Sequence, residues 1–192
     1  MIALGFDVFS LATNHVFDKG EAGLASAYNF FAENPSVTAV GLHKKDEDII
    51  KVVEKNGIKI AFVNYTYLTN GFSHPANTAY QVPLADYKNG CTEMVKTIRE
   101  AKTRADFVVC CVHWGEEYQN TPNAIQKESA KLLADSLAKS DSTDKAQRAY
   151  RKATLHLRIK LLGKIFKKHV LCSPFLRLFI MKSGIKSIKK FT

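Results

Sequence analysis

Residues 5–24 read GFDVFSLATNHVFDKGEAGL, and within them a strand, a loop and the start of a helix follow one another. Apolar residues dominate 5–12, which is typical of a buried strand. The apolar run ends abruptly at Asn14 and His15. Residues 21–33 then predict a helix, because apolar side chains recur at helical spacing at Leu24, Ala27, Tyr28 and Phe31. The stretch therefore indicates one unit of an α/β fold.

A second region of this kind follows the middle of the chain. Residues 92–104 predict a helix, whose inner stripe is formed by Met94, Val95, Ile98 and Ala101. Residues 106–112, DFVVCCV, form a continuous apolar run of the kind found in parallel strands that are covered on both faces. Thr121 and Pro122 predict the start of a helix over 121–139. These units together predict the α/β class.

Between these regions the sequence predicts an antiparallel pair of strands. Residues 49–54 and 58–65 are rich in β-formers and are joined by an Asn-Gly dipeptide, which is the strongest short-range signal of a β-hairpin. Residues 37–42 predict one further strand. Residues 69–89 are polar and contain two prolines, so they predict a long loop, and loops of this length inside a compact domain are often functional.

The formal net charge of +10 is unevenly distributed along the 192 residues. Residues 1–140 contain 14 Lys or Arg and 16 Asp or Glu, whereas residues 141–192 contain 14 Lys or Arg and two Asp. Apolar residues make up 46% of the chain, enough for a substantial core. The sequence therefore predicts a nearly neutral domain at 1–139 and a cationic tail at 140–192.

The cationic tail predicts a basic amphipathic helix. Apolar residues recur at helical spacing between Ala146 and Ile165, and Lys and Arg residues surround them. Three interpretations of the tail remain open. It could contact an anionic membrane surface, with residues 175–181 inserting their apolar side chains, it could bind a polyanion, or it could have no selected role.

The four cysteines predict neither a disulfide framework nor a thiolate metal site, because no CxxC spacing occurs. Cys110 and Cys111 are neighbours in a predicted strand, so their side chains should point to opposite faces. We expect these two, together with Cys91 and Cys172, to be reduced packing residues.

Two of the predicted strands end in residues whose side chains can bind a metal ion or transfer a proton. Asn14 and His15 follow one strand, and His113, Glu116 and Glu117 follow the other. In α/β sheets, binding sites form at the carboxyl ends of strands. Imidazole binds Zn, Mn or Fe, and carboxamide oxygen suits harder ions, so the two ends predict part of a metal site. The alternative for each histidine is a hydrogen-bonded loop residue without a ligand.

Three stretches together resemble the CapA family of capsule or poly-γ-glutamate biosynthesis proteins. They are GFDVFSLATNHVFDKGEAGL at 5–24, NGIKIAFVNYTYLTNG at 56–71 and ADFVVCCVHWGEEYQNTPNAIQKESAKLLAD at 105–135. They occur in the family's order and place the resemblance over about residues 1–139. The resemblance implies a partial α/β/β/α sandwich like that of calcineurin-like metallophosphoesterases, with a two-metal centre at the strand ends.

The resemblance also implies roles for four residues. Asn14 and His113 match positions expected to ligate a divalent metal, which would be Mn, Fe or Zn. His15 matches a histidine expected to act as general acid or to hold a phosphate-like oxyanion. Glu117 matches the Glu of the HWGxEY motif, which is expected to shape the catalytic site. Two neighbouring ions can polarise an oxyanion and lower the pKa of a bridging water.

The chain departs from the family pattern on both sides of these motifs. It contains neither the early Gly-Asp strand nor the NxE motif that follows it, and it lacks the later Gly-His-His-Pro-His and YSLGNF motifs. Thr13 stands where the family usually has Asn. We therefore expect a central fragment of a CapA domain that is catalytically incomplete and binds metal weakly. Whether the chain is an enzyme stays open.

The leading interpretation is a CapA-like protein of capsule or poly-γ-glutamate biosynthesis, which acts on an anionic polymer or a small-molecule substrate at the cell envelope. The rival interpretation is a non-catalytic accessory protein that tethers a membrane or a polyanion through residues 140–192. Nucleic acid is not expected as a partner. The sequence contains no signal peptide and no apolar run long enough to span a membrane, so we expect any membrane contact to be peripheral.

Overall fold

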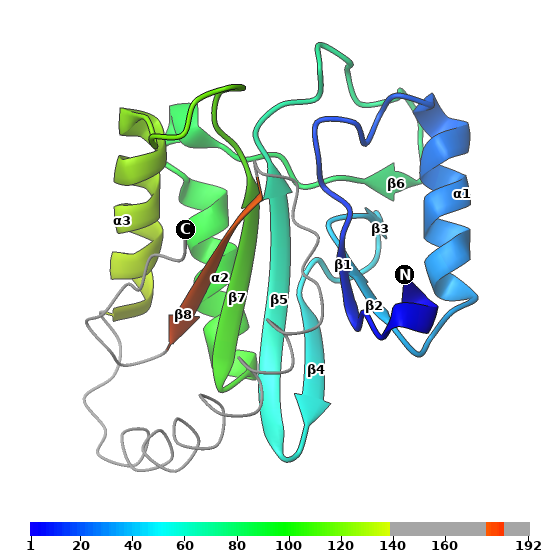
Figure 1. Cartoon of the computed structure of the whole chain (residues 1–192), viewed down its shortest axis with the longest axis horizontal. Helices are drawn as coiled ribbons and strands as arrows, with labels where there is room; N and C mark the ends of the chain where they lie inside the picture. The colour runs from blue at the N-terminus through cyan, green and yellow to red at the C-terminus, as the bar shows by residue number, and fades with distance from the viewer. Residues whose placement is uncertain (139–175, 183–192) are drawn as a thin grey trace.

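The structure is a computed structural model, which describes residues 1–138 and 176–182. Its largest sheet has four strands in the order β4-β5-β7-β8 (Figure 1). The bounds of these strands are Lys51–Lys55 for β4, Ile58–Thr66 for β5, Phe107–His113 for β7 and Leu176–Lys182 for β8. Two smaller sheets pair β1 with β2 and β3 with β6.

The hairpin predicted around the Asn-Gly dipeptide is confirmed. β4 pairs antiparallel with β5, and Lys55 lies opposite Ile58 across the turn. Asn56 and Gly57 both have positive φ angles, 55° and 75°. A two-residue turn with φ positive at both positions matches the twist of the flanking strands, which explains why this dipeptide occurs here.

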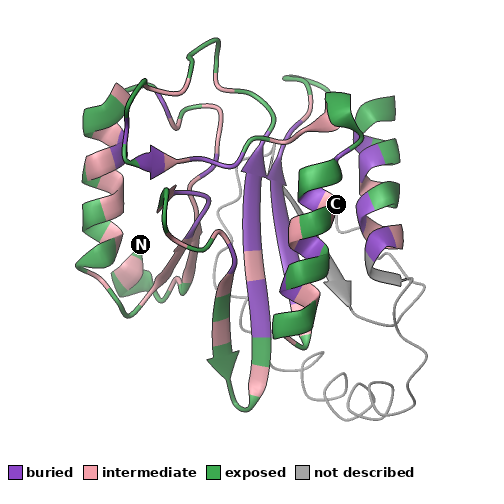
Figure 2. Ribbon diagram, turned by 180° about the vertical axis from the view of Figure 1, so that it is seen from behind, coloured by how far each residue is buried: buried purple, intermediate pink, exposed green. Residues whose placement is uncertain are grey.

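Two helices cover one face of the four-stranded sheet. They are α2, Thr92–Arg104, and α3, Ala124–Ala138, and Figure 2 shows them side by side, with α2 next to β7. The core between helices and sheet contains Val63, Met94, Ile98, Val108, Val112 and Leu133, each at most 1% exposed. Burying a large apolar side chain contributes roughly 1.5–3 kcal/mol. Since β5 and β7 are parallel, the predicted α/β class is confirmed.

The opposite face of this sheet changes character along its length. Near the starts of β5 and β7 it is apolar, with a cluster formed by Ile58, Ile60, Phe62, Phe107, Val109 and Cys111. Towards the carboxyl ends, the alternation of side chains places Asn64, Thr66 and His113 on the same face. Asn64 and Thr66 are fully buried there, and His113 is 8% exposed. Buried polar groups therefore gather at one end of the sheet.

The first part of the chain packs against this polar end. Its elements are a short 3-10 helix, Ile2–Leu4; β1, Val8–Ser10; α1, Gly20–Ala32; β2, Thr38–Val40; and β3, His43–Lys44. From later in the chain, β6, Tyr80–Gln81, pairs with β3, whereas a 3-10 helix at Tyr87–Asn89 precedes α2 on the helix side of the sheet. β1 and β2 are parallel and are connected by α1. A second apolar cluster fills this part and contains Ala12, Phe17, Leu24, Leu42, Tyr80 and Val82.

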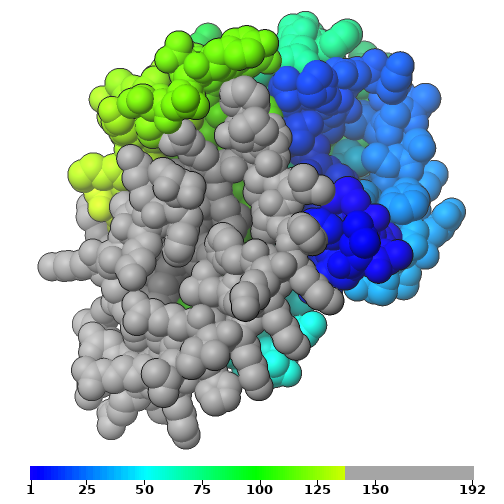
Figure 3. Space-filling view, in the orientation of Figure 1, coloured from blue at the N-terminus to red at the C-terminus, as the bar shows by residue number. Residues whose placement is uncertain are grey.

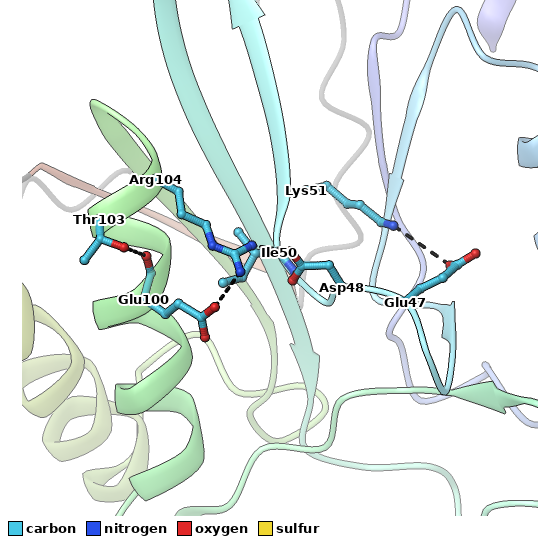
Figure 4. A network of polar contacts seen from close by, with 7 residues as sticks. All are labelled: Glu47, Asp48, Ile50, Lys51, Glu100, Thr103 and Arg104. Carbon is cyan, nitrogen blue, oxygen red and sulfur yellow. Dashed lines mark hydrogen bonds and ion pairs between the residues drawn. The ribbon is translucent and has the colours of Figure 1, made fainter.

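A network of charged side chains connects α2 with the segment that precedes β4 (Figure 4). Arg104, the last residue of α2, pairs with Asp48 and with Glu100. Asp48 Oδ1 also accepts a hydrogen bond from the backbone N–H of Ile50 at 2.9 Å. The Arg104 and Asp48 side chains are 36% and 45% exposed, so water screens their attraction and the ion pair contributes little stability.

The start of α3 and the long loop differ in detail from the prediction. Asn123 caps the helix instead of Thr121: its N–H donates to Gln126 Oε1 at 3.0 Å, and the N–H of Gln126 donates to Asn123 Oδ1 at 2.9 Å. This reciprocal pair satisfies two N–H groups that a helix start leaves unpaired. Within the predicted loop at 69–89, two residues form β6 because β3 offers them a partner.

Three of the four cysteines lie in the described residues. Cys91, Cys110 and Cys111 are buried thiols, as the sequence predicted, and Cys172 lies outside the described residues. Burial raises the pKa of the Cys91 and Cys110 thiols, so neither forms a thiolate readily.

Most of the predicted basic tail, including the helix expected between Ala146 and Ile165, lies outside the described residues. The tail residues that are described, 176–182, form the strand β8, which pairs antiparallel with β7. The edge of β7 offers backbone N–H and C=O groups to such a strand, so pairing decides the structure here. The boundary at residue 139 stays a prediction. No helix within the described part of the chain is long and apolar enough to cross a membrane.

Candidate functional site

His113 is the last residue of β7 and lies at the carboxyl end of the sheet. Because side chains alternate along a strand, His113 faces away from the helices and Trp114 points into the helix-side core, where it is 3% exposed. Gly115 follows with φ at +109°, and a Cβ on it would lie 2.9 Å from Gln126 Nε2. The His-Trp-Gly sequence thus combines a site residue, a core anchor and a tight turn.

The backbone of His113 is fixed by the neighbouring strand. His113 lies opposite Thr66 in the parallel register of β5 and β7. The carbonyl of His113 accepts a hydrogen bond from the N–H of Tyr67 at 2.8 Å. Thr66 is fully buried, and its Oγ1 donates to the carbonyl of Leu68 at 2.9 Å. The loops that follow β5 and β7 therefore begin at the same point on the sheet.

The loop after β1 brings Asn14 and His15 to this edge. Asn14 Nδ2 donates a hydrogen bond of 3.0 Å to Oδ1 of Asn70, which lies on the loop after β5. His15 Nδ1 lies 2.7 Å from Asp18 Oδ2 and 3.3 Å from Asn70 Nδ2. Figure 3 shows the two loops side by side on the surface, in blue and turquoise. Polar side chains from both loops therefore form one cluster.

The contact with Asp18 fixes the tautomer of His15. An ionised carboxylate can only accept a hydrogen bond, so Nδ1 of His15 carries the proton in the 2.7 Å contact. An Nδ1 that carries a proton cannot accept from Asn70 Nδ2, so the 3.3 Å contact is not a hydrogen bond in this state. His15 consequently presents Nε2 to a ligand, as an acceptor when the ring is neutral and as a donor when it is protonated.

His113 lies in a less polar environment than His15. Its Nδ1 atom is buried and has no hydrogen-bond partner among the described residues. Burial lowers the pKa of His113, and the charge of His15 lowers it further. In Figure 1 the loops that follow β1 and β7 lie at the same end of the molecule.

Glu117 lies in the loop after β7, four residues beyond His113. It is exposed, and it makes no hydrogen bond or ion pair with any other residue that the structure describes. The neighbouring Glu116 accepts a hydrogen bond of 3.1 Å from Asn123 Nδ2 and so ties the loop to the start of α3. The catalytic role predicted for Glu117 stays a prediction.

Three further side chains belong to the candidate site, although they do not follow the strand-end pattern that predicts Asn14, His15 and His113: Asp18, Asn64 and Asn70. Asn64 is an amide inside the apolar run AFVNYT, and a polar residue in a buried strand is a signal that could have identified it. Asn70 lies in the stretch TYLTNG, whose resemblance to a family motif is its only signal in the sequence. Asp18 gives no comparable signal, because acidic residues are common in loops.

The available donors fit only part of a metal site. The unpartnered Nδ1 of His113 and the carboxamide oxygen of Asn14 are suitable ligand atoms. However, residues 1–138 and 176–182 contain no group of three or more His, Cys, Asp or Glu that could hold a metal ion. Catalytic zinc, for comparison, usually has three protein ligands. The described residues therefore do not complete a metal centre.

Residues 1–140 match the family model described as bacterial capsule synthesis protein PGA_cap. The chain belongs to this capsule synthesis family. The matched residues include both strand ends, with Asn14, His15, His113 and Glu117. The match confirms the resemblance that the three sequence stretches indicated.

Two relatives of the capsule synthesis family show how much of a longer protein this chain corresponds to. The PGA biosynthesis protein CapA of Bacillus subtilis (strain 168) is 33% identical over 135 residues, which make up 69% of this chain and 34% of that protein. The capsule biosynthesis protein CapA of Bacillus anthracis is 32% identical over 137 residues, with 68% and 32% covered. The chain thus spans about a third of the length of these relatives.

A further similarity is confined to a shorter stretch. Protein CbrA of Escherichia coli is 46% identical to the chain over 61 residues, which make up 32% of this chain and 16% of that protein. This stretch is too short to carry a statement about the whole chain.

Proposed function

We propose that this chain acts in the synthesis of a bacterial capsule or of poly-γ-glutamate, and that the loops after β1 and β7 form its ligand-binding edge. Membership of the capsule synthesis family supports the biological role. The names of the two CapA relatives refer to PGA and capsule biosynthesis, and we extend these processes to this chain.

The polar cluster at the end of a largely apolar sheet carries the proposal. Asn14 and Asn70 are hydrogen-bonded to each other, and His15 lies beside them. Burial favours the neutral form of His113, so the site offers hydrogen-bond donors without an excess of positive charge. Neutral donors that are already held in place are well suited to bind an oxyanion. The ligand class that fits is a carboxylate or a phosphate-like group.

In this proposal His15 either donates a proton to the ligand or contacts its oxyanion directly. Asp18 orients the imidazole through Nδ1, which leaves Nε2 to meet the ligand. Histidine is the side chain most often used for general acid–base catalysis. The His15 side chain is 67% exposed, so even a polymeric ligand can reach it.

We also propose that Asn14 and His113 contribute two ligands to a divalent metal site, for Mn, Fe or Zn. The unpartnered Nδ1 of His113 supports this assignment. A bound metal would offset the negative charge of the ligand oxyanion. With only two ligands from the described residues, we expect the affinity of this chain for the metal alone to be weak.

A location at the cell envelope is a further part of the proposal, and it follows from the capsule-related role. The rival role, that of a non-catalytic accessory protein, depends on contacts of the basic tail with a membrane or a polyanion. Only residues 176–182 of that tail are described, and they pair with β7. No feature of the described residues favours the rival role.

Titration of the isotope-labelled full chain with a γ-linked glutamate oligomer, and separately with inorganic phosphate, tests the proposal by NMR. We expect the amide signals of Asn14, His15, Asn70 and His113 to shift. Because a hydrogen bond to a charged ligand is lost, His113→Ala should weaken binding by about tenfold or more.

The matched control is His43→Ala, since His43 is a partly buried histidine of β3 whose pKa is also lowered by burial. This variant should bind like the wild type. Shifts centred elsewhere on the chain, or equal affinities of His113→Ala and the wild type, would contradict the proposed site.

A further inference from the structure

Asn64 interrupts the apolar sequence of β5 with a fully buried carboxamide. It lies opposite Cys111 in the register with β7, on the face of the sheet that turns away from α2 and α3. Burying a carboxamide is unfavourable unless both its donor and its acceptor are paired. The contacts of Asn64 therefore indicate what the side chain does.

The carboxamide of Asn64 joins two sheets. Its Oδ1 accepts a hydrogen bond of 2.8 Å from the N–H of Ala12, just after β1. Its Nδ2 lies 3.2 Å from the carbonyl oxygen of Cys111 in β7, with longer approaches of 3.4 Å to the carbonyl of Tyr65 and 3.5 Å to that of Ala12. Within the described residues, β1 and β7 belong to sheets that share no strand pairing. Asn64 thus supplies a polar link that the backbone ladders do not.

This link lies close to both halves of the candidate site. Ala12 comes two residues before Asn14, and Cys111 comes two residues before His113. At roughly 3.3 Å for each extended residue, both site residues lie within about 7 Å of the link along the chain. A shift of Ala12 relative to Cys111 would therefore move Asn14 relative to His113.

Gly41 keeps the space around this link open. It has a φ of +90°, and a Cβ at this position would lie 2.1 Å from Asn64 Oδ1 and 2.7 Å from the backbone nitrogen of Ala12. The N–H of Leu11 also donates to the carbonyl of Val40 at 2.8 Å. The segment after β2 consequently closes over the hydrogen bond between Asn64 and Ala12, and a residue with a Cβ does not fit there.

We infer that Asn64 is a positioning residue, whose carboxamide sets the separation between the loop that carries Asn14 and His15 and the strand end that carries His113. The inference rests on the proposed function, because it assigns Asn64 to the site proposed there. Asn64 acts through the backbone of Ala12 and not through the ligand. Both ends of the carboxamide are needed, since a side chain with only an acceptor or only a donor keeps only one of the two contacts.

Amide hydrogen exchange and amide chemical shifts of the full chain, measured without ligand, test this inference. In Asn64→Ala we expect the exchange rate of the Ala12 amide to rise about tenfold relative to amides in the centre of β7, because its hydrogen bond is lost. The amide shifts of Asn14 and His15 should change as well. Val63→Ala is the matched control, since Val63 is equally buried in β5 but faces the helices. It should leave this exchange ratio and the two shifts unchanged.

Gly41→Ala provides a second test in case Asn64→Ala does not fold. Its added methyl group would push the Asn64 carboxamide away from Ala12, so the same rise in exchange is expected. An unchanged Ala12 exchange ratio and unchanged signals of Asn14 in a folded variant would overturn the inference. Because these quantities belong to the free chain, that result differs from a failure to bind the glutamate oligomer or phosphate, which would overturn the proposed function instead.

Discussion

His15 and His113 lie on segments from different sheets, and the charge of His15 acts on His113. Burial lowers the pKa of His113, and the charge of His15 lowers it further. His15 follows β1, His113 ends β7, and the carboxamide of Asn64 lies between these two strands. A change to His15 should therefore be detectable at His113.

Replacing His15 with alanine should raise the pKa of His113. The positive charge of His15 disfavours a second charge nearby, so removing it eases protonation of His113, while burial still keeps the pKa below its ordinary value of 6.5. The pKa can be measured from the histidine ring signals in an NMR titration. His43→Ala serves as control and should not alter the titration of His113. If His113 titrates identically in His15→Ala and the wild type, the two imidazoles are not neighbours.

The chain should lose stability as the pH falls below about 6.5. Burial lowers the pKa of both His43 and His113, with further lowering by the charges of Lys51 and His15 respectively. Between the lowered pKa and 6.5, the unfolded chain binds more protons than the folded chain, so the free energy of unfolding decreases with decreasing pH. Each histidine can change the free energy of unfolding by at most about 1.4 kcal/mol per pH unit.

Urea unfolding between about pH 7 and about pH 5 measures this effect, because most carboxyl groups titrate below that range. The double variant His43→Gln, His113→Gln should show a smaller slope than the wild type. A free energy of unfolding that stays constant or rises as the pH falls through this range would be incompatible with the lowered pKa values.

Two glycine positions with similar φ angles should respond very differently to alanine. Gly57 has φ +75° and open space around it, so Gly57→Ala should cost only the strain of the left-handed conformation, about 1–2 kcal/mol. Gly41 has φ +90° and lies against Asn64 and Ala12, so Gly41→Ala should cost more than about 3 kcal/mol. Denaturant unfolding provides both values. Equal costs would show that the region around Asn64 is not tightly packed.

The ion pair between Arg104 and Asp48 should contribute little to the free energy of unfolding. The hydrogen bond from the backbone N–H of Ile50 to Asp48 should contribute more. Arg104→Ala should cost less than about 1 kcal/mol, because both side chains are partly exposed. Asp48→Asn keeps an oxygen for the N–H of Ile50, but Asp48→Ala removes it and should cost about 1 kcal/mol more than Asp48→Asn. Thermal unfolding of the three variants compares these terms. Equal costs of Asp48→Asn and Asp48→Ala would rule out a contribution from the backbone contact.

The sequence was sufficient to predict the centre of the main sheet. The apolar run before His113, the helix over 92–104 and the Asn-Gly turn are local signals, and local signals determined β4, β5, β7 and α2. Asn14, His15 and His113 could be selected for the same reason, because each follows or ends a recognisable apolar strand.

The remaining features depend on contacts between distant segments, which a single sequence does not reveal. β3 and β6 have two residues each and exist only through their pairing with one another. β8 forms at the edge of β7, although the tail around it was predicted to be helical. A buried carboxamide at Asn64 is explained only by its hydrogen bonds to Ala12 and Cys111, which are distant from it in the sequence.

Paramagnetic broadening by Mn²⁺ tests the central claim most directly, because it reports closeness even when binding is weak. The measurement is an NMR titration of the labelled full chain with Mn²⁺. We predict that the amide signals of Asn14, His15 and His113 broaden together at the lowest Mn²⁺ concentrations, and that His113→Ala suppresses this broadening. Broadening centred on the acidic residues 46–48, with these three signals unaffected, would contradict a shared site at the ends of β1 and β7.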